Sequence, residues 1–134
     1  MTALLVVAAG AAVGAVLRAL AERVQAVVLA HALARHGERW YLSPGWSTLA
    51  VNLVGTVLLG WAAGRYDVGA LGTTGLIALG TGLAGGLTTF STLGVEIVDL
   101  VRDRARARLA LLLAAHVVLG LACATIGYRL GTIV

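Results

Sequence analysis

Hydrophobic residues occur along this chain in four long runs that charged residues separate. The segments without any charged residue are 3–17, 40–64, 68–95 and 109–128. In the first run, apolar residues continue past Arg18 as far as Ala30. A membrane-spanning helix needs about 20 predominantly apolar residues. The pattern therefore predicts four transmembrane helices, near residues 3–28, 45–64, 70–98 and 109–130.

Composition supports lipid as the solvent of these helices. Of the 134 residues, 60% are hydrophobic and 12% are charged, and the mean hydropathy is +0.96. Soluble domains carry roughly 25% charged residues, and a chain this short has too little interior to hide so much apolar surface from water. We expect an all-α, multi-pass protein of the cell membrane, with residues 1–134 forming one domain in a lipid bilayer.

Arginine provides all ten basic residues and the net charge of +4. The arginines flank the apolar runs, so they indicate topology rather than a nucleic-acid surface. The first and third loops, which lie on one side of a four-span protein, carry Arg35, Arg39, Arg102, Arg104, Arg106 and Arg108. The other side has only Arg65 and Arg129. This excess predicts that both termini lie outside the cytoplasm.

The third run contains an unusual polar and glycine-rich stretch, GTGLAGGLTTFST, at residues 80–92. Glycine is a poor helix former, and clustered Ser and Thr side chains compete for backbone hydrogen bonds. Non-helical backbone at membrane depth persists only when protein buries it or when it lines a wet cavity. We therefore predict a helix broken near Gly85–Thr88, with carbonyl groups available to an ion. The GxGxxG spacing at 80–85 lacks the βαβ context of a dinucleotide site.

If the helix resumes after the break, Thr88, Thr92 and Glu96 share one stripe, and Phe90 and Leu93 fall on another face. Such hydroxyl groups either hydrogen-bond neighbouring helices or line an ion pathway. Four hydroxyl residues within positions 88–92, directly after the glycines, favour the pathway.

Other polar residues inside the spans have two interpretations each. Asn52 either bonds another helix or donates to an anion. Arg18 faces the bundle interior or water, and Glu22 is a candidate partner at i+4. His116 is more often a packed, hydrogen-bonded histidine than a metal ligand. Glycine pairs such as Gly10/Gly14, Gly60/Gly64 and Gly82/Gly86 allow close helix packing, either within a subunit or between subunits.

Residues 85–96, GGLTTFSTLGVE, resemble the signature of the Fluc (CrcB) fluoride channel family, GGxTTFSTF followed by a glutamate. The segment GAAVGAVLR at 10–18 and the segment NLVGT at 52–56 agree with that family as well. The resemblance implies an antiparallel dimer with two fluoride pores and a structural sodium ion at its centre. It implies sodium ligation by the carbonyl groups of Gly85 and Thr88. The implied pore residues are Asn52, Phe90, Ser91 and Thr92, with Arg18 and Glu96 as supporting residues.

Two departures from the family pattern affect these expectations. Leu93 replaces the second phenylalanine, and Leu112 and His116 stand where the fourth span should carry a polar track of tyrosine and serine. Together with the uneven arginines, this leads to the hypothesis of a fixed-orientation subunit whose partner is a second homologue.

The expected function is a passive, fluoride-selective channel subunit that exports fluoride and relieves its toxicity. The alternatives are a non-conducting partner subunit and a small multidrug-type exporter. An exporter needs a carboxylate central in the first span, whereas Glu22 lies late in it beside Arg23. No motif of an enzyme is present in the sequence.

Overall fold

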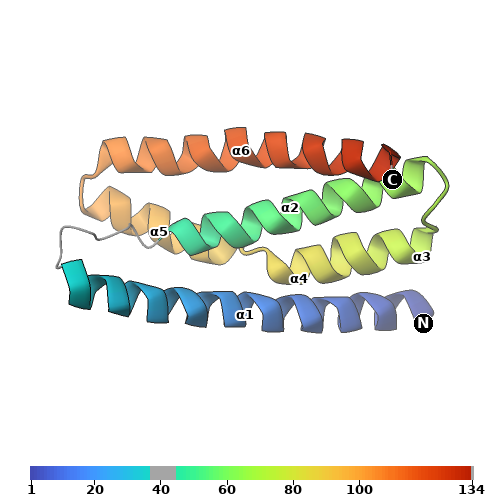
Figure 1. Ribbon diagram of the computed structural model, residues 1–134, viewed down its shortest axis with the longest axis horizontal. Helices are drawn as coiled ribbons and strands as arrows, with labels where there is room; N and C mark the ends of the chain where they lie inside the picture. The colour runs from blue at the N-terminus through green and yellow to red at the C-terminus, as the bar shows by residue number, and fades with distance from the viewer. Residues whose placement is uncertain (37–44, 134) are drawn as a thin grey trace.

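The computed structural model describes residues 1–36 and 45–133, and almost all of this part of the chain is helical (Figure 1). The elements in chain order are α1 (Thr2–His36), α2 (Gly45–Asp67), α3 (Thr73–Leu76), the π-helical segment η2 (Ile77–Ala84), α4 (Gly85–Leu87), α5 (Phe90–Arg102) and α6 (Arg106–Ile133). Four stretches are long and apolar enough to cross a membrane: Thr2–Val28, Ser47–Asp67, Thr73–Arg102 and Arg106–Ile133. The predicted four-span, all-α architecture is confirmed.

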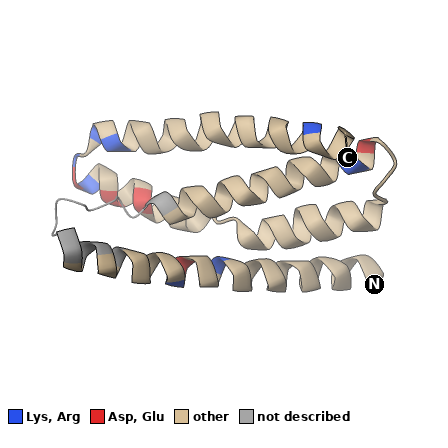
Figure 2. Cartoon of the chain, in the orientation of Figure 1, with Lys and Arg blue, Asp and Glu red and all other residues tan. Residues whose placement is uncertain are grey.

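The four spans lie side by side, with α1 at one edge and α6 at the other (Figure 1). The elements α3, η2, α4 and α5 together make the third span. Both ends of the chain lie at one end of the bundle, and the turn between α5 and α6 lies at the other (Figure 1). Arginines cluster around that turn (Figure 2). Arg39, on which the topology argument partly rests, lies outside the described residues.

Contacts at glycines join the four spans into two pairs of helices. On α2, a Cβ atom at Gly60 would lie 2.4 Å from the carbonyl oxygen of Ala124, and one at Gly64 would lie 2.3 Å from that of Tyr128. Because both numbers rise together, α2 and α6 run parallel in direct backbone contact. Near the C-terminal ends of both helices, the Tyr128 hydroxyl donates to Asp67 Oδ2 at 2.6 Å.

The same packing joins α1 to the first half of the third span. A Cβ atom at Gly14 would lie 2.3 Å from the carbonyl oxygen of Leu83, and one at Gly86 would lie 2.4 Å from that of Ala11. The small-residue pairs therefore serve packing within this chain, one of the two interpretations that their spacing left open.

The predicted break in the third span is confirmed, and Thr88 and Thr89 form it. Helix continues through Leu87, and then Thr88 (φ −76°, ψ 155°) and Thr89 (φ −141°, ψ 121°) adopt extended backbone. The preceding segment, η2, has π-helical hydrogen bonding, a form that is rare and frequently marks functional sites. Two extended residues at membrane depth expose backbone groups that other parts of the chain must satisfy.

Candidate site at the break of the third span

Asn52 of α2 satisfies both backbone groups of Thr89. Its Nδ2 donates to the Thr89 carbonyl oxygen at 3.1 Å, and its Oδ1 accepts from the Thr89 N–H at 2.8 Å. The amide thus replaces the helical hydrogen bonds that Thr89 loses at the break. An amide nitrogen carries two hydrogens, so Asn52 retains a second donor. Both interpretations of Asn52 therefore remain compatible with its geometry.

The two carbonyl groups expected to face an ion differ in their partners. The Thr88 carbonyl oxygen accepts from Nη1 of Arg18 at 3.0 Å. The Gly85 carbonyl oxygen would accept from Thr89 in a continuous helix, but that N–H donates to Asn52 instead. Among the described residues, the Thr88 hydroxyl alone approaches the Gly85 oxygen, at 3.5 Å, the limit of a hydrogen bond. Gly85 is therefore the more available of the two carbonyl ligands.

Hydroxyl groups cluster where α5 begins. The Thr89 side chain is the N-cap of α5 and accepts from the Thr92 N–H at 3.3 Å. Its Oγ1 lies 3.2 Å from Ser91 Oγ and 3.0 Å from Thr92 Oγ1. Ser91 and Thr92 are exposed in the single chain. Hydroxyl donors at the positive end of a helix form an environment that favours an anion.

A groove of about 340 Å³ lies between α2 and the third span at this level. It is lined by Asn52, Gly55, Thr56, Leu59, Gly80, Ala84, Gly85, Thr88, Thr89 and Phe90. Four of the residues predicted from the sequence, Asn52, Gly85, Thr88 and Phe90, thus meet in one place. Ser91 and Thr92 adjoin it through Thr89 but do not line it.

Thr48 is a polar neighbour that the sequence reasoning missed. Its Oγ1 donates to Glu96 Oε1 at 2.5 Å, and it is only 2% exposed. A signal was available, because Thr48 lies four residues before Asn52 and so shares its face of the helix. The contact places Glu96 of α5 against α2.

Three sequence-based expectations need correction. Thr88 does not share a helical stripe with Thr92 and Glu96, because α5 begins only at Phe90. Phe90 and Leu93 do not share an environment, since Phe90 is 82% exposed and Leu93 is 8% exposed.

The third correction concerns Arg18. Arg18 was expected to pair with Glu22 on its own helix. Its side chain instead donates a hydrogen bond to the Thr88 carbonyl oxygen of the third span.

The expectation for His116 has partial support. Its Nδ1 lies 2.9 Å from the Leu112 carbonyl oxygen, which makes it a hydrogen-bonded histidine. The described residues include no group of three or more His, Cys, Asp or Glu side chains that could hold a metal ion.

This arrangement defines a class of protein: a multi-pass helical membrane protein whose third span is interrupted at a polar, groove-lining centre. The model of the family described as "CrcB-like protein, Camphor Resistance (CrcB)" matches residues 5–128. The chain belongs to this family.

Relatives of the chain cover most of its length. It is 44% identical over 84 residues to fluoride-specific ion channel FluC 1 of Geobacillus kaustophilus, covering 63% of this chain and 69% of the relative. It is 38% identical over 120 residues to fluoride-specific ion channel FluC of Novosphingobium aromaticivorans, covering 90% and 88%. A third relative, fluoride-specific ion channel FluC of Phenylobacterium zucineum, is 41% identical over 109 residues, covering 78% and 76%. These relatives carry the names of ion channels and not of enzymes.

Proposed function

We propose that this chain is a subunit of a passive, fluoride-selective ion channel. The observation that carries the proposal is the extended Thr88–Thr89 break, which two cross-span hydrogen bonds from Asn52 hold beside a polar groove. The names of the relatives supply the ion. The chain contains no P-loop or other motif for an energy source, so fluoride would flow down its gradient.

The residues at the break offer what a small, strongly hydrated anion requires. The second amide hydrogen of Asn52 and the hydroxyls of Ser91 and Thr92 would replace water molecules as donors to fluoride. The exposed Phe90 ring would present its positive edge to the anion. Arg18 adds a positive charge at the same depth through its bond to the Thr88 carbonyl.

A structural sodium ion would be held by the carbonyl oxygens of Gly85 and Thr88. The availability of the Gly85 oxygen supports this site, and each carbonyl has two lone pairs, so Thr88 retains one beside Arg18. The cation would neutralise carbonyl groups that the helix break leaves exposed.

The channel would assemble as an antiparallel dimer. Phe90, Ser91 and Val95 are exposed on α5, and Phe90 and Ser91 adjoin the polar centre of the chain. A second subunit that covered this face would complete the groove. The arginines around the α5–α6 turn (Figure 2) support an orientation of this subunit with both termini outside. The channel would export fluoride from the cytoplasm and so relieve its toxicity.

Leu93 supports the alternative of a non-conducting partner in a heterodimer. It packs inside its own chain, where the family signature has a phenylalanine. The small multidrug-type exporter gains no such support, since Glu22 is exposed on α1 and lies more than a turn beyond Arg18.

Fluoride efflux from liposomes that contain only this protein, read with a fluoride electrode, tests the proposal. We expect fast efflux of fluoride and no comparable efflux when chloride replaces fluoride inside the liposomes. The fluoride efflux should require sodium on one side of the membrane. Folded protein that conducts nothing alone, but conducts with a second homologue, would establish the heterodimer. Equal efflux of chloride would overturn the proposal.

A further inference from the structure

Two side-chain atoms are buried without a hydrogen-bond partner in the described part of the chain: Glu96 Oε2 and His116 Nε2. Both belong to membrane spans, where an unsatisfied polar group costs more than at a wet surface. Neither atom is used by the mechanism proposed above. One shared partner would satisfy both.

The ring of His116 has a defined tautomer. Its Nδ1 lies 2.9 Å from the Leu112 carbonyl oxygen, which can only accept. Nδ1 therefore carries the hydrogen, and in the neutral ring Nε2 is an acceptor. Glu96 Oε1 receives the Thr48 hydroxyl hydrogen, so Oε2 is the oxygen without a partner, and it can only accept unless it carries a proton. Two acceptors cannot bond each other unless a proton lies between them.

The packing of α2 on α6 brings these residues to the same depth. Gly60 lies against Ala124 and Tyr128, and Gly127 lies against Val57 and Trp61, which makes Gly60 and Gly127 level with each other. Thr48 and His116 each lie about three helical turns before those glycines.

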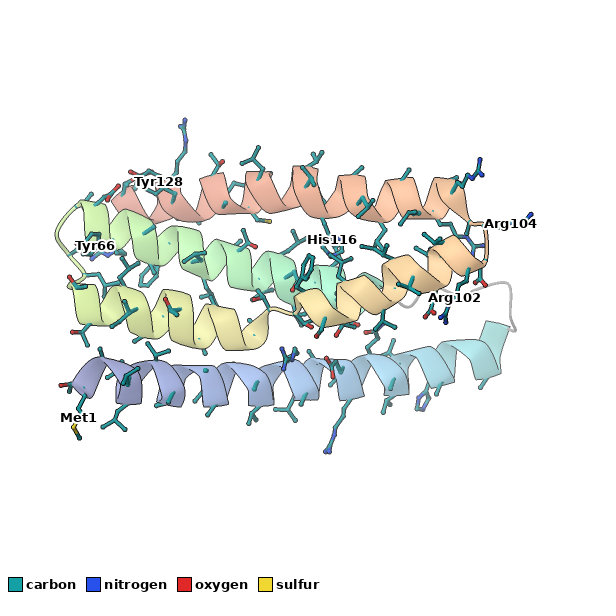
Figure 3. The ribbon with its side chains drawn as sticks, turned by 180° about the vertical axis from the view of Figure 1, so that it is seen from behind. Met1, Tyr66, Arg102, Arg104, His116 and Tyr128 are labelled. Atoms are coloured by element: carbon teal, nitrogen blue, oxygen red, sulfur yellow. The ribbon has the colours of Figure 1, made fainter. Side chains whose placement is uncertain are left out.

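Thr48 therefore lies at the level of His116, and Thr48 holds Glu96. The His116 side chain projects from α6 toward the layer of α2 and α5 (Figure 3).

We propose that Glu96 and His116 bind one proton between them and form a proton-sensitive pair beside the anion pathway. Formation of the pair requires rotation of the Glu96 carboxyl about its last torsion, which is soft, so that Oε2 faces Nε2. The proton then lies on Oε2 and is donated to Nε2, or lies on Nε2 and is donated to Oε2. The pair is neutral in either form.

The charge of the pair sets the expected direction of a pH effect, and this consequence rests on the proposed channel function. Loss of the proton leaves a carboxylate with net charge −1, which repels an anion from Asn52, because the carboxylate is bonded to Thr48 one helical turn before Asn52. A second proton gives the pair a charge of +1. Fluoride flux should therefore rise as pH falls.

No other charged side chain of the described residues is seen to neutralise Glu96 in place of this proton. The neighbouring spans present Arg18, Glu22 and Arg23 from α1, Asp99 and Arg102 from α5, and Arg106 and Arg108 from α6. Arg18 is bonded to Thr88, and the rest are exposed. The α2 segment 47–64 has no titratable side chain.

Titration of both groups in the full-length protein tests the pairing without any measurement of flux. Nitrogen NMR follows the His116 ring, and infrared spectroscopy follows the Glu96 carboxylic acid band, which Glu96→Gln identifies by its loss. The His116 midpoint should move by at least about one pH unit in Glu96→Gln, since strongly coupled sites interact by that much. His31 is a matched control, because its Nδ1 makes the same bond to Val27 but the residue is exposed. An unchanged His116 midpoint would overturn the pairing.

Flux measurements separate this inference from the proposed function. Liposomes at symmetric pH, corrected for leakage through protein-free liposomes, should show flux that falls severalfold as pH rises. His116→Gln should flatten that dependence, and His31→Gln should not. Coupled titrations without fluoride flux in any variant would reject the channel and retain the pair. Fluoride flux that His116→Gln leaves equally pH-dependent would reject the pair and retain the channel.

Discussion

The two halves of the third span are stabilised in different ways. Before the break, η2 and α4 lie directly on the backbone of α1, where glycine contacts leave no room for a Cβ atom. After the break, α5 has a polar side held by Thr48 and a side with Phe90, Ser91 and Val95 that is exposed among the described residues. The first half is therefore fixed within the subunit, and the second half is incomplete within it.

The break between these halves is held by side chains from two other spans. Arg18 of α1 bonds Thr88, and Asn52 of α2 bonds Thr89. Each of the two extended residues is thus hydrogen-bonded by a side chain from a different span. The difference between the halves indicates that the first half packs the fold, and in the proposed channel the break and the second half would conduct the ion.

Gly86→Ala in the first half should destabilise the fold while leaving the polar groups at the break paired. The new Cβ atom would lie 2.4 Å from the Ala11 carbonyl oxygen, a backbone atom that cannot rotate away. Overpacking of this kind costs about 1–3 kcal/mol. Thermal unfolding of the purified protein would measure it, with Gly120→Ala as control, because nothing lies within 4 Å of a Cβ atom there. Equal stability of the two variants would show that α1 and α4 are not packed as described.

Asn52→Ala should cause the largest loss of conduction. It leaves the N–H and carbonyl of Thr89 without partners, at about 1–3 kcal/mol each, and it also removes the amide donor from the groove. We expect fluoride flux to fall roughly 100-fold or more, since about 1.4 kcal/mol corresponds to a factor of ten. Val54→Ala, on an exposed face of the same helix, is the control. Wild-type flux from Asn52→Ala would contradict both roles of the amide.

The sequence predicts the spans, the position of the break and the close approach of glycines, because these follow from local composition and spacing. It does not predict which helices the glycines join. It also favours contacts four residues apart, such as Arg18 with Glu22, whereas Arg18 reaches Thr88, seventy residues away. Cross-span partners depend on the relative depth and rotation of helices, which spacing within one helix does not encode.

The start of α5 illustrates the same limit. Thr89 is a favoured N-cap residue, and its bond to Thr92 is a local pattern that the sequence contains. The extended conformation of Thr88, however, is stabilised by Arg18 from another span. The stripe expected from Thr88 to Glu96 was wrong for this reason.

Arg18→Gln should have a smaller effect than Asn52→Ala. It weakens the single charged hydrogen bond to Thr88, a bond worth about 1.5–3 kcal/mol, and it removes positive charge near the break. Fluoride flux should fall about tenfold, and the apparent affinity for sodium should change as well, because Thr88 is a proposed ligand. Arg23→Gln, an exposed arginine of the same helix, should alter neither. If both variants behave alike, Arg18 does not hold the break.

Gly94 provides the smallest expected effect on the fold and the sharpest test of the uncovered half. In the part of the chain that the structure describes, nothing lies within 4 Å of a Cβ atom at this position of α5. Gly94→Ala should therefore change subunit stability by no more than about 0.5 kcal/mol. Gly94→Trp should still fold, but it should reduce the dimer fraction measured by crosslinking in liposomes, because its bulk would meet the second subunit. Ala122→Trp, exposed on α6, controls for the added indole. Normal dimerisation of Gly94→Trp would mean that α5 faces lipid, and the contrast between the two halves would then require another explanation.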